Sequence, residues 1–180
     1  MKILDLSAGN RAIWIQKNLD FVTFIDKRPG TLPDFICDSR EIPEKVGDKF
    51  DLVVFDPPHL NAGKSSNTSK TYGHHTTEEI LDTVEKTAQE AHRVSRSEAL
   101  MAFKWNDHDI SLDRALELMS PYWNPLFGHH LRNRGGASAK SQSFWVMLIR
   151  RDEKTDPLNM KQVGRDNKRA RTTHKAAYQL

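Results

Sequence analysis

Polar and acidic residues follow four short apolar runs of this sequence, and their spacing could build a ligand site. The four segments are Asp5-Leu6-Ser7-Ala8-Gly9, Asp26, Cys37-Asp38-Ser39 and Asp56-Pro57-Pro58-His59. If the apolar runs are parallel strands of an open α/β sheet, these segments lie beyond the carboxyl ends of the strands, where such sheets bind ligands. Carboxylates there can accept hydrogen bonds from hydroxyl and amino groups. Each segment alone is a weak signal, because an acid that closes a strand is often only a helix cap.

Apolar runs of β type predict the strands that would position these residues. They cover 3–7, 22–26, 35–38, 50–56, 99–105, 125–131 and 143–150. The first five are nearly continuous in apolar residues, as expected of strands that are buried on both faces. A Gly-rich basic loop joins the last two runs and leaves no room for a helix, which predicts an antiparallel C-terminal hairpin.

Two helical patterns lie between the later strands. Thr76 and Glu79 have the spacing of a capping box, and Ser111 is placed to cap a second helix. The apolar faces are Ile80, Val84, Ala88, Ala91 and Val94 in the first helix, and Leu112, Ala115, Leu116 and Met119 in the second. Strands that alternate with helices predict an α/β fold with a doubly wound, mostly parallel sheet.

The four segments, taken together and in this order, resemble class I S-adenosylmethionine-dependent methyltransferases. The tetrad Asp56-Pro57-Pro58-His59 is similar to that of amino-methyltransferases that modify exocyclic nitrogens of nucleic-acid bases, and the stretches ILDLSAG, TFID and ICDS support the likeness. Around 93–94 and 103–106 the chain also resembles small prokaryotic and viral adenine methyltransferases. The resemblance covers about residues 3–150 and implies a minimal Rossmann-like methyltransferase fold.

The resemblance implies S-adenosylmethionine as cofactor and gives each strand end a role toward it. The segment 5–9 would face the methionine portion, Asp26 the two ribose hydroxyls, and Asp38 or the backbone beside it the adenine amino group. For Asp38 and Ser39, capping of the next short helix is the alternative. The implied cofactor-binding residues are Asp5, Ser7, Ala8, Gly9, Asp26, Asp38, Ser39 and Asp56.

The tetrad would carry the reaction, with Asp56, Pro57, Pro58 and His59 as its catalytic residues. An exocyclic amine on a purine is a poor nucleophile, because its lone pair is delocalised into the ring. The Asp56 carboxylate and the Pro57 carbonyl could accept hydrogen bonds from the two N–H groups of the amine. These bonds would aim the nitrogen lone pair at the methyl group. His59 stands where the family usually has a larger aromatic ring that stacks on the base. A plain turn after a strand is the alternative reading of this segment.

The pattern departs from the family in three places. The loop after the first strand has one glycine where two or three are usual, which also disfavours a nicotinamide-binding G-x-G-x-x-G loop. The link 27–34 has only eight residues with Pro29, Gly30 and Pro33, so the family's crossover helix is expected to be absent. The helix that precedes the first strand in the family is likewise expected to be absent.

Basic and aromatic residues in the later loops are candidates for contact with nucleic acid. They are Lys64, Lys70, Tyr72, Lys104, Arg132, Arg134 and Lys140. The loop 61–75 could close over a flipped-out base, and 132–140 could bind phosphates, although an exposed surface loop and a hairpin tip are the alternatives. The pairs His74-His75 and His129-His130 lack carboxylate or cysteine partners at ligand spacing, so no metal site is expected.

Composition and charge set the class of protein and its domains. The 180 residues have 37 % hydrophobic residues and a net charge of +3, but nine basic and four acidic residues fall from Arg150 onward. A methyltransferase domain at 1–151 and a basic tail at 152–180 are therefore predicted, with a polyanion as partner or a solvated tail as the alternative. A single cysteine, Cys37, and the lack of a long apolar run indicate a cytoplasmic protein without a membrane span.

The sequence thus favours transfer of a methyl group from S-adenosylmethionine to adenine N6, most readily in DNA. Because N6 is not reachable for in-line attack inside a duplex, the base must flip out or lie in a single strand. The alternatives are a methyltransferase for adenine or guanine in RNA, and a non-catalytic nucleic-acid-binding subunit of a two-chain methyltransferase. A homodimer or a partner subunit stays open.

Overall fold

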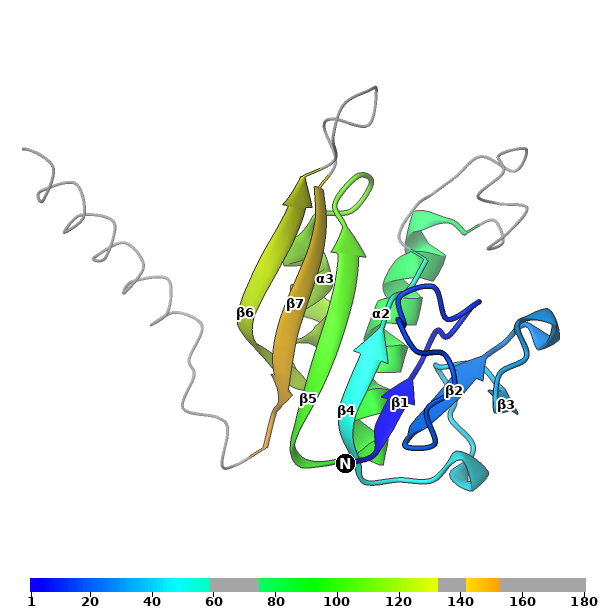
Figure 1. Cartoon of the computed structure of the whole chain (residues 1–180). Coiled ribbons are helices and arrows are strands. Elements are labelled where there is room, and N and C mark those ends of the chain that lie inside the picture. The colour runs from blue at the N-terminus through cyan, green and yellow to red at the C-terminus, as the bar shows by residue number, and fades with distance from the viewer. Residues whose placement is uncertain (59–74, 133–141, 153–180) are drawn as a thin grey trace, which may run out of the picture.

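A computed structural model describes residues 1–58, 75–132 and 142–152, with the backbone alone at 130–132. Its centre is a seven-stranded sheet in the order β3-β2-β1-β4-β5-β7-β6 (Figure 1). The strands are β1 (Ile3–Asp5), β2 (Val22–Asp26), β3 (Phe35–Ile36), β4 (Phe50–Phe55), β5 (Ser95–Asn106), β6 (Trp123–Arg132) and β7 (Gln142–Arg150). The predicted α/β class is confirmed.

Strand directions also follow the prediction. β1 pairs in parallel with β2 and β4, β2 with β3, and β4 with β5. β7 lies between β5 and β6 and runs antiparallel to both, so the C-terminal hairpin is confirmed. The carboxyl ends of β1, β2, β4 and β5 therefore meet at one edge of the sheet.

Two helices cover one face of the sheet, α2 (Thr77–Val94) and α3 (Leu112–Met119) (Figure 1). The predicted capping box is present, because Thr76 Oγ1 accepts the Glu79 N–H and the Glu79 carboxylate accepts the Thr76 N–H. Ser111 caps α3 by accepting the Arg114 N–H. Neither helix has the length and apolar character that crossing a membrane requires, a statement that covers only the described ranges.

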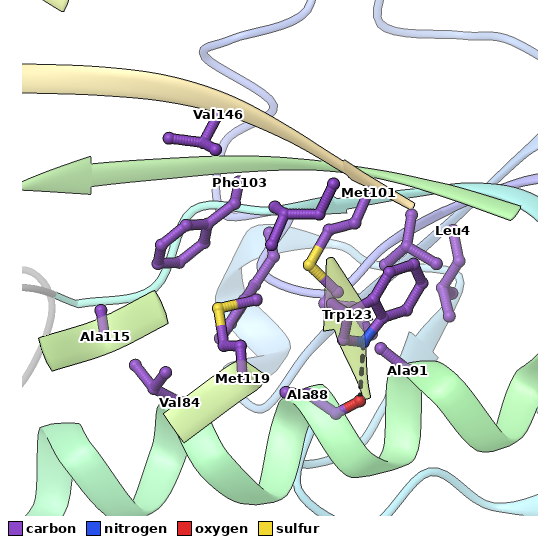
Figure 2. Close-up of a cluster of buried hydrophobic side chains, with 14 of the residues drawn as sticks. Leu4, Val84, Ala88, Ala91, Met101, Phe103, Ala115, Met119, Trp123 and Val146 are labelled. Carbon is purple, nitrogen blue, oxygen red and sulfur yellow. Dashed lines mark hydrogen bonds between the residues drawn. The ribbon is translucent and has the colours of Figure 1, made fainter. Parts of the chain in front are cut away.

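The main core fills the space between these helices and the sheet. Trp123 of β6 packs over Ala88 and Ala91 of α2, and its indole nitrogen donates to the Ala88 carbonyl at 3.0 Å (Figure 2). This bond matters because a buried N–H without a partner would cost about 1–3 kcal/mol. Trp105 of β5 is fully buried, and its indole nitrogen donates to the Ile110 carbonyl at 2.9 Å, which ties the end of β5 to the chain that follows it.

The links on the N-terminal side are thinner. The crossover 6–21 between β1 and β2 contains no helix, and the link 27–34 contains only the 3-10 turn Pro29–Thr31. The expected loss of a helix at 27–34 is thus confirmed, and a second 3-10 turn, Glu44–Val46, precedes β4. A smaller apolar cluster lies on the other side of the sheet: Ile3, Ala8, Val22, Phe24 and Val54, with Trp14 and Trp145 beside it.

Several strand bounds differ from the predicted ranges. β1 ends at Asp5 rather than residue 7, because the Asp5 carboxylate accepts the Ser7 N–H and bends the chain. β3 has only two residues, and β5 begins four residues earlier than predicted, at Ser95. The predicted division into 1–151 and a tail falls just after β7, and stays a prediction because 153–180 lie outside the described residues.

Candidate functional site

Three carboxylates and one lysine gather at the carboxyl edge of the sheet. Asp5 closes β1, Asp26 closes β2, Asp56 directly follows β4, and Lys104 lies near the end of β5. β2, β1, β4 and β5 are consecutive neighbours in the sheet, so these residues form a row across its edge. The strand arrangement therefore brings these residues, which the sequence analysis grouped, to one edge of the sheet, and their role as a ligand site stays a prediction.

Asp5 is fully buried and its carboxylate faces the turn that follows β1. It accepts the Ser7 N–H at 3.1 Å and the indole N–H of Trp14 at 2.7 Å. Burial raises the pKa of Asp5 to about 6, the two hydrogen bonds act in the opposite direction, and the carboxylates of Asp56 and Asp26 add a further upward contribution. The side chain thus shapes the turn, and its predicted role toward a cofactor stays a prediction.

Trp14 is a site residue that the sequence reasoning missed. Besides its bond to Asp5, it packs edge-on against Phe24 of β2 with ring centroids 5.5 Å apart. It stands in the helix-free crossover 6–21, where no periodic pattern indicates which side chains point inward. The available signal was a large aromatic residue nine positions after a strand-closing acid.

Asp26 has all its hydrogen-bonding capacity engaged within the chain. The Gly9 N–H donates to Oδ2 at 2.8 Å, and Arg28 donates its backbone N–H and Nε to Oδ1 and its Nη2 to Oδ2, at 2.8 to 2.9 Å. Burial acts to raise the pKa of Asp26, but the hydrogen bonds from Arg28 and Gly9 outweigh it and the pKa is lowered. Asp26 is therefore an anion that ties the β1 turn to the end of β2.

Gly9 has the backbone conformation that the sequence reasoning required of it. Its φ is +50°, in the left-handed region that favours glycine, and a Cβ there would lie 3.4 Å from Arg28 Nη2. Ala8 is buried, and its N–H donates to the Ile25 carbonyl of β2. The turn is thus held close to β2, with the Arg28 guanidinium against its outer side.

Asp38 and Ser39 follow β3 and are also engaged. Arg40 donates its backbone N–H and Nε to Asp38 Oδ1 and its Nη2 to Oδ2, so the pKa of Asp38 is lowered chiefly by Arg40. Ser39 Oγ lies 3.0 Å from Thr87 Oγ1 of α2. The 3-10 turn at Glu44–Val46 has no side-chain cap, so neither residue caps the next short helix.

Asp56 is held at two points. Its backbone N–H donates to Ser7 Oγ at 2.9 Å, and Lys104 Nζ donates to its Oδ2 at 2.6 Å. Pro57 is buried and Pro58 half-buried, while His59 lies outside the described residues. The Ser7 hydroxyl therefore joins the start of the tetrad directly to the β1 turn, a link between two predicted segments that spacing alone could not give.

Lys104, a candidate for nucleic-acid contact, bonds to Asp56 and so belongs to the row of side chains at this edge. The remaining candidates for nucleic-acid contact cannot be placed: Lys64, Lys70, Tyr72, Arg134 and Lys140, and the side chain of Arg132, all lie outside the described part of the chain. Trp105, the next residue of β5, is fully buried in the core. Within the described ranges no group of three His, Cys, Asp or Glu side chains could hold a metal ion.

Comparison with solved structures identifies the fold. The chain is similar to the N-methyltransferase NodS from Bradyrhizobium japonicum WM9 in complex with S-adenosyl-L-homocysteine, at 9 % identity and TM-score 0.54 over 84 % of this chain and 78 % of that one. It is also similar to a TehB-like SAM-dependent methyltransferase from Corynebacterium glutamicum, at 13 % identity and TM-score 0.52 over 83 % and 80 % of the two chains.

A third solved structure, an rRNA methylase from Streptococcus thermophilus, matches at 12 % identity and TM-score 0.50 over 83 % of this chain and 86 % of that one. No protein-family model and no curated protein matches the sequence. The strand order with an antiparallel β7 and these likenesses define the fold: it is the class I, Rossmann-like fold of S-adenosylmethionine-dependent methyltransferases.

The residues at the carboxyl edge are of the types that a nucleoside cofactor needs. Gly9 adds no side chain of its own to the β1 turn, and Asp26 and Asp38 bring carboxylates to the ends of the next two strands. Arg28 is the feature that a bound ribose would have to accommodate, because it donates to both oxygens of Asp26.

Proposed function

We propose that this protein transfers a methyl group from S-adenosylmethionine to an exocyclic amino group of a nucleic-acid base, in the first place adenine N6 in DNA. One observation carries the proposal. The Asp56 N–H donates to Ser7 Oγ, so the carboxylate suited to an amino acceptor stands beside the turn suited to the cofactor. Methyl transfer requires these two groups to be close together.

When bound, S-adenosylmethionine would supply a methyl group on a sulfonium sulfur, and its transfer leaves S-adenosylhomocysteine and one proton from the acceptor nitrogen. The chain's own residues would position the acceptor. The Asp56 carboxylate accepts one N–H of the amine and the Pro57 carbonyl the other, which directs the nitrogen lone pair away from the ring. Consecutive prolines favour this geometry, since each fixes its φ near −65°.

The turn Ser7–Gly9 and the carboxylates of Asp26 and Asp38 would hold the cofactor. For Asp26 this requires that the Arg28 guanidinium give up at least one of its two bonds to the carboxylate. The Arg28 side chain is about one-third exposed, so water can replace the protein partner when the guanidinium moves.

RNA is the second candidate acceptor. The likeness to an rRNA methylase favours it, and Asp56 would meet an amino group of an RNA base in the same way. The experiment is incubation of the full chain with isotopically labelled S-adenosylmethionine and unmethylated DNA and RNA pools, followed by mass spectrometry of the nucleosides. Labelled N6-methyl-2′-deoxyadenosine from the DNA pool, or labelled N6-methyladenosine from the RNA pool, supports the proposal. Methylation of neither pool would contradict it. If calorimetry then also detects no cofactor binding, the non-catalytic subunit is favoured, whereas cofactor binding without methylation points to a different acceptor.

A further inference from the structure

A partly buried ion pair at the candidate site links the residue that follows β4 to the end of β5. Lys104 Nζ lies 2.6 Å from Asp56 Oδ2, and the two side chains are 26 % and 21 % exposed. Because the pair is more shielded from water than an ordinary surface salt bridge, it holds the two charged groups in place more firmly. Within the described residues no other side chain bonds to the Asp56 carboxylate.

The lysine stands on a rigid part of the fold. Phe103, its neighbour, pairs with Phe55 of β4 in the parallel register, and Lys104 itself pairs with Trp145 of β7. β5 is therefore bonded to strands on both sides at this position. Asp56, by contrast, lies just past the end of β4, where its backbone is held through Ser7. Lys104 thus fixes the free end of a side chain whose backbone has already left the sheet.

We propose that Lys104 is a positioning residue for the transfer reaction: its ammonium group holds Asp56 Oδ2 and turns Oδ1 toward the acceptor amine. The inference rests on the proposed function and adds to it a residue that the sequence assigns only to nucleic-acid contact. A carboxylate accepts the amine hydrogen bond in the correct direction more readily when its other oxygen is already held. Less conformational entropy is then lost when the reactive geometry forms.

The same pair would affect how the site distinguishes the charged cofactor from its neutral product. Asp5, Asp26 and Asp56 bring negative charge to this edge, and the Lys104 ammonium offsets part of it. Without that ammonium, Asp56 would attract the sulfonium cation more strongly, whereas the uncharged thioether of S-adenosylhomocysteine would gain nothing. We expect Lys104→Met to raise the affinity for S-adenosylmethionine relative to S-adenosylhomocysteine roughly three- to tenfold.

A matched control exists in the same two strands. Arg96 of β5 pairs with Asp51 of β4 at 2.6 Å, at the opposite edge of the sheet. Arg96→Met removes one cation from a β4–β5 ion pair as Lys104→Met does, but away from the site. The experiment compares wild type, Lys104→Met, Lys104→Arg and Arg96→Met. Calorimetry gives the affinities for S-adenosylmethionine and S-adenosylhomocysteine, and kcat is measured on the unmethylated nucleic-acid pool that the wild type modifies. Circular dichroism verifies folding.

Lys104→Met is expected to lower kcat roughly 10- to 100-fold, to shift the ligand affinity ratio as stated, and to add no further loss to Asp56→Asn in a double-mutant cycle. Lys104→Arg should restore most of the activity, and Arg96→Met should behave as wild type. Unchanged kcat with a raised KM and a shallower salt dependence would overturn the proposal and assign Lys104 to phosphate contact. An unchanged affinity ratio in a folded Lys104→Met would also overturn it. Failure of wild type to bind either ligand would instead refute the proposed function.

Discussion

Arg28 binds both carboxylate oxygens of Asp26, and it does so from only two residues further along the chain. Together with the backbone N–H groups of Arg28 and Gly9, it supplies four donors to one carboxylate. In methyltransferases that resemble this chain, the acid at this strand end is expected to meet a ribose. Here an intramolecular cation competes for the same oxygens, so the strength of that competition should set cofactor affinity.

Replacing Arg28 by methionine should therefore tighten cofactor binding. The substitution leaves the Gly9 bond to Asp26 in place and releases the oxygen lone pairs that the guanidinium uses. One relieved competing hydrogen bond corresponds to about 1 kcal/mol, or about a fivefold lower Kd for S-adenosylmethionine in calorimetry. Arg114→Met, which removes a cation paired with Glu117 on α3, serves as control. A weaker affinity in Arg28→Met would mean that the guanidinium contacts the cofactor itself.

Asp26→Ala should have the opposite effect. We expect cofactor binding to weaken by roughly 1–3 kcal/mol, the cost of a lost charged hydrogen bond, while the domain still folds. The variant also leaves the Gly9 N–H and Arg28 without their partner, so the melting temperature should fall by a few degrees. Calorimetry and thermal unfolding measure the two effects, and an unchanged Kd would exclude Asp26 from the ribose site.

The burial of Asp5 predicts a specific pH dependence of stability. Its pKa is raised from 3.8 to about 6, so the folded state binds this proton more tightly than the unfolded state. The stabilisation is complete below about pH 4, and is lost as the pH rises through about 6, a change of about 3 kcal/mol in the free energy of unfolding. Comparing urea unfolding of wild type and Asp5→Asn between pH 4 and 7.5 isolates the contribution of Asp5 to the free energy of unfolding. The wild type should lose stability relative to the variant as pH rises, and parallel curves would show that Asp5 does not titrate in this range.

Where sequence periodicity was strong, the sequence predicted the structure well. The capping box at Thr76 and Glu79 and the buried face from Ile80 to Val94 follow from spacing alone, because one helix face packs on one sheet. Trp14 and Arg28 could not be assigned in this way. Both lie in irregular links, where a side chain's partner depends on how the strands converge. Lys104 was recognised as a candidate, but the register of β4 against β5, which gives it Asp56 as partner, is a tertiary property.

Asp56→Ala tests the tetrad directly. Turnover should fall roughly 100-fold or more, because the acceptor amine loses the carboxylate that orients it, while the Kd for S-adenosylmethionine should stay within a few-fold. The Ser7 bond to the Asp56 backbone survives the substitution, so the turn beside it keeps its support. Single-turnover kinetics with saturating nucleic acid give the rate. A near-normal kcat would make the segment a plain turn after β4 and place the catalytic residues elsewhere in the chain.

The basic tail should add affinity for nucleic acid without changing the chemistry. Deletion of residues 155–180 removes six Lys and Arg side chains, which lie outside the described residues. If three or four of them contact phosphates of duplex DNA, the slope of log K against log salt should fall by roughly three units. Fluorescence anisotropy at several salt concentrations measures the slope, and kcat at saturating substrate should barely change. An unaltered slope would show that the tail does not bind phosphates.

Between β2 and β3 the chain has only the turn Pro29–Thr31, and β3 pairs through two residues. Backbone amides at this end of the sheet should therefore exchange with solvent through local opening, at a lower free energy than the amides of β5 and β7. A ligand held by both Asp26 and Asp38 would bridge exactly the two strands that open. Part of its binding free energy would then go into closing them, so stiffening a link that never touches the ligand would tighten its binding.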